Sequence, residues 1–176
     1  MTKLETLCLS CGLCCDGSLF DNVRLGPNDD AADLKRRGLP VRRSRAKKPV
    51  TYFRQPCRAL GADCACGVYQ NRPRQCRSFE CQVFKEVAAG RVEIESALRT
   101  VKQARRKAEK VRRLLRDAGE RDETLSLTKR FRRVQRRLVS GQVDAATAEV
   151  YGDLGLAMHQ FDLLAHRTFH TLAEDA

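Results

Sequence analysis

The placement of the cysteines constrains this chain more than any other feature of its sequence. All nine cysteines of the 176 residues lie between residues 8 and 81. Their number is odd, and at about 5% of the chain they are sparser than in small disulfide scaffolds. The chain shows no apolar stretch of transmembrane length and no signal-peptide core near its start. We therefore expect a cytoplasmic protein, without a transmembrane segment, whose reduced thiols bind metal.

The first cysteine cluster has the spacing Cys8-x2-Cys11-x2-Cys14-Cys15. Two-residue spacings allow successive sulfur atoms to surround one metal centre, as in zinc knuckles and ferredoxins. The side chains of the adjacent pair diverge, so that two neighbouring cysteines chelate a single tetrahedral ion poorly. We therefore expect Cys14 and Cys15 to serve two sites, or one of them to serve and the other to bridge.

The second cluster comprises Cys57, Cys64, Cys66, Cys76 and Cys81. Pro73 predicts a turn that places Cys76 at the start of a helix. The free backbone N–H groups there, with Arg74 and Arg77 beside them, are expected to favour the thiolate that metal ligation requires. With Arg72, these two arginines would offset the thiolate charge.

Together these residues resemble the YkgJ-type cysteine-cluster family, the zinc- or iron-chelating CxxCxxCC domain. The resemblance covers about residues 8–84 and includes the CxxCxxCC start and Cys66-Gly-Val-Tyr-x2-Arg-Pro-x2-Cys-Arg-x-Phe. Arg58 stands where proline often follows the fifth cysteine, and Cys64 is an additional thiol that we interpret as a bystander. The resemblance implies a metal-ligand set of eight: Cys8, Cys11, Cys14, Cys15, Cys57, Cys66, Cys76 and Cys81.

The metal is open at this point, because structural zinc and an iron–sulfur cluster satisfy the pattern equally well. The favoured function is a metal-binding protein with one or two thiolate centres. An iron–sulfur redox or protein-modifying enzyme is an alternative, since some relatives are labelled oxidoreductases and flagellin lysine N-methylase carries a similar cluster. Another is a nucleic-acid-binding module with structural zinc. The chain has no phosphate loop, dinucleotide fingerprint or nucleophile elbow, and enzymatic activity stays open.

The predicted fold is mainly α, with a loop-rich metal-binding head over residues 1–84 and a helical region over residues 85–176. In the head we expect a helix over Asp29–Arg37, a strand over Val50–Phe53 and a helix over Arg77–Ala89.

The helical region is expected to form an antiparallel hairpin or small bundle. A helical stripe from Ile94 ends at Gly119, and a second ends at Gly141. A third helix follows Asp144. The inward positions of the third are Val150, Leu154, Phe161, Ala165, Thr168 and Leu172. Gly152 and Gly155 on the same helix predict a close helix contact.

The charge is unevenly distributed along the chain. The net charge is +12, with +10 in residues 85–140 and −5 in residues 141–176. The cations of residues 99–137 predict either a solvated face, partly balanced by the acidic tail, or a surface for nucleic acid, an acidic protein partner or a membrane surface. Phe131 is expected to face inward, which leaves no aromatic platform for bases. The C-terminal histidines, His159, His166 and His170, are interpreted with Asp162 as a wet polar face.

Overall fold

The computed structural model describes residues 3–142 and 144–170, and 54% of the chain is helical. The mainly α fold is therefore confirmed. The helices are α1 (Lys3–Cys11), α2 (Ala31–Arg36), α3 (Arg74–Ser78), α4 (Gln82–Ala88), α5 (Ile94–Asp117), α6 (Leu127–Val139) and α7 (Ala145–Thr168). A 3-10 turn covers Tyr69–Asn71, and the strands are β1 (Asn22–Arg24), β2 (Arg42–Arg43) and β3 (Thr51–Arg54). Within the described ranges, no helix combines the length and apolarity needed to cross a membrane.

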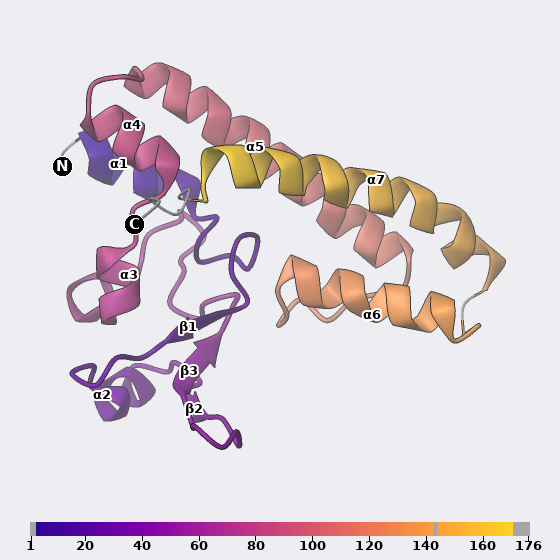
Figure 1. The fold of residues 1–176 in the computed structure, drawn as a ribbon, viewed down its shortest axis with the longest axis horizontal. Coiled ribbons are helices and arrows are strands. Elements are labelled where there is room, and N and C mark those ends of the chain that lie inside the picture. Colours follow the sequence, from indigo (N-terminus) through magenta and orange to yellow (C-terminus); the bar gives the residue numbers. More distant parts are fainter. Residues whose placement is uncertain (1–2, 143, 171–176) are drawn as a thin grey trace.

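The two longest helices, α5 and α7, run antiparallel along one side of the molecule, with α6 beneath them (Figure 1). Apolar residues recur along α5 in steps of three and four, which aligns them on one face. These buried positions are Ala97, Val101, Ala104, Ala108, Val111 and Leu115. The alanines among them let α7 approach closely, and Leu154, Phe161 and Ala165 of α7 are buried in the same core. The second half is thus a small helical bundle.

The ends of these helices follow their local sequence. Gly119 adopts φ +73 just beyond α5, where other residues are strained. The Asp144 carboxylate caps α7 by accepting a hydrogen bond from Thr147 N at 2.7 Å. The prediction for Gly152 and Gly155 is wrong, because a Cβ at either would meet nothing within 4 Å. Leu172 lies outside the described residues.

The head contains more regular structure than its sequence predicts. The helix expected over Asp29–Arg37 is present as α2, and the strand expected over Val50–Phe53 is present as β3. The single helix expected over Arg77–Ala89 is wrong. The chain forms α3 and α4 instead, because the extended backbone of Phe79 and Cys81 separates them. Helix α1 was not predicted at all.

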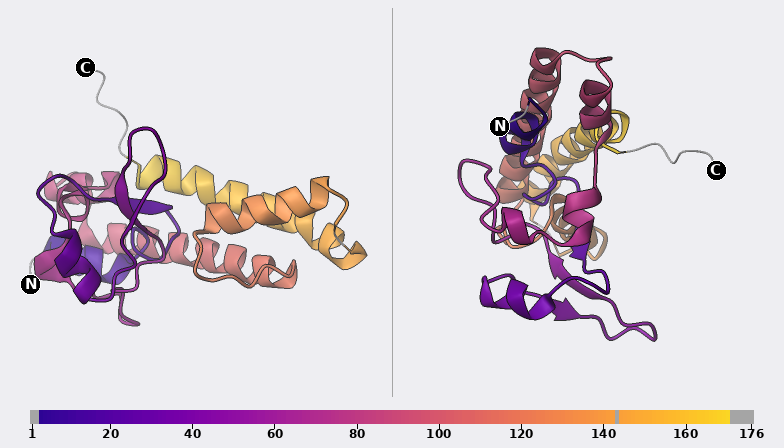
Figure 2. Two further views of the ribbon diagram at one scale, coloured as in Figure 1. Left: turned by 90° about the horizontal axis from the view of Figure 1, so that it is seen from below. Right: turned by 90° about the vertical axis from the view of Figure 1, so that its left-hand side faces the viewer.

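Two hydrophobic cores support the head. The sheet has the antiparallel order β1-β3-β2 and pairs Val23 with Phe53. Phe53 is 1% exposed and belongs to a small core with α2 and Val68. Leu7, Leu13 and Val83 belong to the main core, which continues into the bundle. Figure 2 shows the head gathered at one end of the elongated bundle. The division at residue 84 stays a prediction.

Candidate metal centre

Helix α1 and the turn after it position the first four thiols. Cys8 and Cys11 lie on the last turns of α1, which packs against α4 and α5 (Figure 1). Gly12 ends the helix with φ +67, and its missing Cβ would lie only 3.1 Å from Cys64 Sγ. A side chain at residue 12 is therefore unfavourable on both counts. The chain then turns tightly through Cys14 and Cys15.

Backbone contacts bring the second cluster against the first. Cys57 N donates a hydrogen bond to Cys15 O at 2.7 Å, which joins the two clusters directly. Cys66 pairs with Leu60 in a short antiparallel bridge. Cys76 N donates to Pro73 O at 2.9 Å in the first turn of α3, as the sequence predicts. The last cysteine, Cys81, lies at the N-terminal end of α4.

Electrostatic interactions divide eight of the thiols into two sets. The thiol of Cys14 interacts with Cys11, Cys81 and Cys8, and also with its neighbour Cys15. The thiol of Cys15 interacts instead with Cys57, Cys66 and Cys76. Apart from their interaction with each other, the adjacent cysteines therefore face different groups of thiols. We call Cys8, Cys11, Cys14 and Cys81 the first set, and Cys15, Cys57, Cys66 and Cys76 the second set.

Burial governs the protonation of these thiols. It raises the pKa of Cys11, Cys15 and Cys76 to about 12, and neighbouring thiolates add to the effect. At Cys76, burial outweighs the positive charge of Arg72, so that this thiol keeps its proton in the metal-free chain. The expected contribution of the helix end, Arg74 and Arg77 to its ionisation stays a prediction.

The eight thiols line one cavity of about 370 Å³ beneath α1, α3 and α4. Aromatic side chains close its walls, among them Phe20, Phe53 and Phe79. The ninth thiol, Cys64, does not line this cavity. It lies in a separate surface hollow beside Asp63 and Arg105. The cavity therefore contains the eight cysteines of the family pattern and leaves out the additional one.

One arginine acts on both sets of thiols. The positive charge of Arg72 lowers the pKa of Cys8 in the first set and of Cys76 in the second, although burial outweighs it in each case. Its guanidinium stacks 3.6 Å from the centre of the Tyr69 ring, and its Nε donates to Tyr69 O at 3.0 Å. Arg72 is thus held where it offsets negative charge in both sets.

The two other arginines of this motif both contact Asp29, Arg74 through its backbone N–H and Arg77 through its side chain. Arg74 N, at the start of α3, donates to Asp29 Oδ1 at 2.8 Å. Arg77 lines the cavity and approaches the same oxygen at 3.9 Å. The Asp29 side chain is only 3% exposed and also accepts from Gly26 N at 2.7 Å. Asp29 therefore fixes α3, and no sequence motif singled it out.

A second carboxylate joins the cysteine turn to the bundle. Asp16, directly after Cys15, accepts a hydrogen bond from Arg112 Nη2 of α5 at 2.7 Å. The same nitrogen donates to Ser18 Oγ at 2.8 Å, and Asp16 Oδ1 accepts from Ser18 N at 2.8 Å. The sequence analysis missed this link because the two partners lie far apart in the chain.

The donor set fits a thiophilic metal centre. Zinc and iron–sulfur clusters are both held by cysteine thiolates, and eight thiols around one cavity supply such ligands. A bound cation would relieve the mutual repulsion that ionised thiols experience in each set. Within the described ranges, however, no three His, Cys, Asp or Glu side chains are arranged to hold a metal ion as they stand.

Comparison with known proteins identifies the domain. Residues 7–112 match the family model "CxxCxxCC: Putative zinc- or iron-chelating domain". The chain belongs to this family. The match extends beyond the cysteine pattern, through α4 and into α5 as far as Arg112. Family membership and the cysteine-rich head support metal binding without distinguishing zinc from iron. No curated protein and no solved structure shows significant similarity to the chain.

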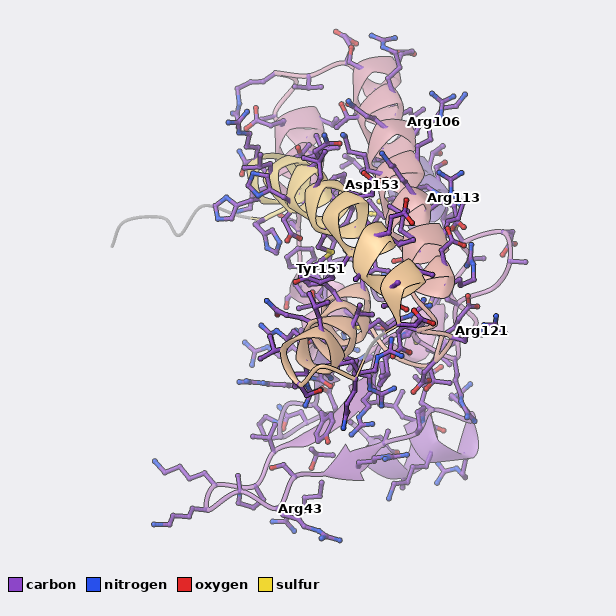
Figure 3. All side chains as sticks on the ribbon, turned by 90° about the vertical axis from the view of Figure 1, so that its right-hand side faces the viewer. Arg43, Arg106, Arg113, Arg121, Tyr151 and Asp153 are labelled. Atoms are coloured by element: carbon purple, nitrogen blue, oxygen red, sulfur yellow. The ribbon has the colours of Figure 1, made fainter. Side chains whose placement is uncertain are left out.

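Many cations of residues 99–137 are engaged within the molecule. Arg116 pairs with Glu109 and Glu123. Arg130, expected at the surface, is 2% exposed, because its Nη2 donates to Glu120 O at 2.8 Å beyond the end of α5. Arg106 and Arg113 are exposed on α5 (Figure 3).

Phe131 faces inward as predicted, and two of the three C-terminal histidines are exposed. Phe131 is partly buried and stacks on Tyr151 of α7, with ring centres 6.1 Å apart. His159 and His166 are exposed on α7, as expected of a wet polar face. His170 is partly buried and contacts the Phe20 ring edge-on at 6.3 Å.

Proposed function

We propose that the head holds two metal centres, each bound by four thiolates. The first would be ligated by Cys8, Cys11, Cys14 and Cys81, and the second by Cys15, Cys57, Cys66 and Cys76. The observation that carries this assignment is the opposite grouping of the adjacent Cys14 and Cys15. A reducing cytoplasm, which we propose as the location, would keep these thiols available for metal.

We further propose that both centres are iron–sulfur clusters. Zinc requires four sulfur atoms about 2.3 Å from one point, which draws the thiols tightly together. The described thiols of the metal-free chain are not gathered that closely. The cavity of about 370 Å³ also offers more room than two single ions need. Iron–sulfur clusters would supply electron-transfer chemistry at this site.

The protein's own residues would set the environment of these centres. Arg72 would offset negative charge in both sets through its position above Tyr69. Phe20 and Phe79 would limit the access of water, since their rings meet edge-on at 5.0 Å in the cavity wall. Both the charge and the exclusion of water shift the reduction potential of an iron–sulfur centre.

Metal and sulfide analysis of protein purified without oxygen tests the proposal. Two four-iron clusters predict about eight iron and eight sulfide per chain, with visible absorbance near about 400 nm that bleaches on reduction. About two zinc ions per chain and no colour would overturn the cluster assignment while keeping two thiolate centres. A folded protein with neither metal would overturn both.

A further inference from the structure

The hairpin between β2 and β3 carries the densest exposed positive charge outside the helical bundle. Five of the seven residues from Arg42 to Lys48 are cationic, and the segment contains no carboxylate. These cations, all exposed, are Arg42, Arg43, Arg45, Lys47 and Lys48. Across the described ranges, none of the five side chains makes a hydrogen bond or an ion pair. They differ in this from Arg112, Arg116 and Arg133, which pair with carboxylates of the fold.

The hairpin has a defined structure rather than a loose tip. Ser44 N donates to Val50 O at 2.9 Å, and Val50 N donates to Ser44 Oγ at 2.9 Å. These two bonds close the loop over residues 45–49. At its base, β2 pairs with β3 through Arg42 opposite Tyr52 and Arg43 opposite Thr51. The hairpin projects from the body on the side away from α5 (Figures 1 and 2).

The base of the hairpin is fixed in the small core of the head. Val41 is 7% exposed and Phe53 is 1% exposed, so that a buried residue lies on each side of the hairpin. The same core is bordered by Cys57, Cys66 and Cys76 of the second set. A rigid base holds the cations away from the body, where the carboxylates of the fold do not reach them.

We propose that this hairpin is an arm that binds double-stranded nucleic acid through its phosphates. Arg42 and Arg43 are successive strand residues, so their side chains point to opposite faces of the ribbon. A groove of duplex DNA has phosphates on both sides, and the major groove is wide enough for a two-stranded ribbon. A flat acidic protein surface would meet only one of these faces.

The other residues of the hairpin favour contacts to the DNA phosphate backbone that do not depend on the base sequence. Its loop offers no aromatic ring for stacking on unpaired bases, which disfavours single strands. It also lacks the buried aromatic or aliphatic anchor that protein interfaces use at their centre. Phosphate contacts alone give affinity that falls steeply with salt and varies little with sequence. The proposal is independent of which metal the head binds.

Fluorescence anisotropy with a labelled 20-base-pair DNA duplex tests the arm in the full-length, metal-loaded protein. The variant Arg43→Glu/Lys47→Glu reverses two cations of the hairpin. Its matched control, Arg106→Glu/Arg113→Glu, reverses two exposed cations of α5 and changes the net charge equally. We expect the hairpin variant to bind at least about tenfold more weakly at 50 mM salt, with a salt slope lower by about two. The control should stay within about threefold of the parent.

Several outcomes would overturn the proposal. They are undetectable binding of the parent at low salt, equal losses in both variants, and binding of a single strand as tight as that of the duplex. Efficient competition by polyglutamate at equal charge would indicate an acidic protein partner instead. Metal content and circular dichroism confirm that both variants fold. If the charge-reversed hairpin variant does not fold, the neutral variant Arg43→Gln/Lys47→Gln should still lower the salt slope of DNA binding.

Discussion

The two hydrophobic cores of this molecule differ in how much apolar surface supports them. Among the described residues, the main core contains 18 buried residues, drawn mostly from α1, α4 and the three bundle helices. The small core of the head contains six, and three thiols of the second set border it. A region with so few buried apolar residues usually needs a metal or a disulfide to stay folded. The comparison indicates that apolar packing stabilises the bundle and the part of the head around Cys11 and Cys81, which border the main core. The sheet and the second set of thiols depend more strongly on metal.

Metal removal is expected to have the largest effect on this comparison. Stripping the metal under reducing conditions should lower amide-exchange protection in β3 and α3, while α5 and the middle of α7 stay protected. The apparent binding free energy of a structural metal reaches about 10–16 kcal/mol at neutral pH, more than a small core supplies. Hydrogen exchange detected by mass spectrometry measures the protection of each segment, with the metal-loaded protein as the control. An equal loss of amide-exchange protection in the head and in the bundle would contradict the proposed difference in what stabilises the two regions.

Alkaline pH is expected to weaken the metal-free head further. Burial raises the pKa of Cys11, Cys15 and Cys76 from 9.0 to about 12, so these thiols keep their protons while those of the unfolded chain ionise. The stability present below pH 9 is therefore lost as the pH rises towards 12, by about 1.4 kcal/mol per pH unit for each thiol. Urea unfolding of metal-stripped protein at pH 8 and pH 10 measures the loss. A head equally stable at both values would contradict the burial of these thiols.

The bundle can be weakened without disturbing the centres. Phe161 of α7 is 1% exposed in the main core, and Phe161→Ala should cost about 3–5 kcal/mol of unfolding free energy. Leu156→Ala is the matched control on the same helix, where Leu156 is 55% exposed and little should change. Urea denaturation gives both values. The metal content of each folded variant should equal that of the parent. Loss of metal in Phe161→Ala alone would show that metal binding depends on packing in the bundle.

The helices of the bundle could be predicted because their determinants are local. Apolar spacing and end residues such as Gly119 and Asp144 act within a few neighbours, and α5, α6 and α7 follow them. Helix α1 had the same signal, since Leu4, Leu7, Cys8 and Cys11 follow helical spacing once cysteine counts as apolar.

The remaining features depend on contacts between distant segments. The divergence of neighbouring side chains predicted two roles for Cys14 and Cys15, but their partners come from the packing of α4, α3 and the loops. No local signal revealed the open surroundings of Gly152, the burial of Arg130 or the link from Asp29 to α3. Helical spacing also continues across Phe79–Cys81, where the extended backbone nevertheless separates α3 from α4.

The central claim is the division of eight thiols into two sets, and metal stoichiometry in three serine variants tests it most directly. Cys14→Ser and Cys15→Ser alter adjacent residues that face different sets, whereas Cys64→Ser alters the thiol outside the cavity. Each of the first two should retain about half of the metal, and combining them should leave almost none. Cys64→Ser should retain all of it. Complete loss from Cys14→Ser or Cys15→Ser alone, or loss from Cys64→Ser, would contradict two separate four-thiol centres.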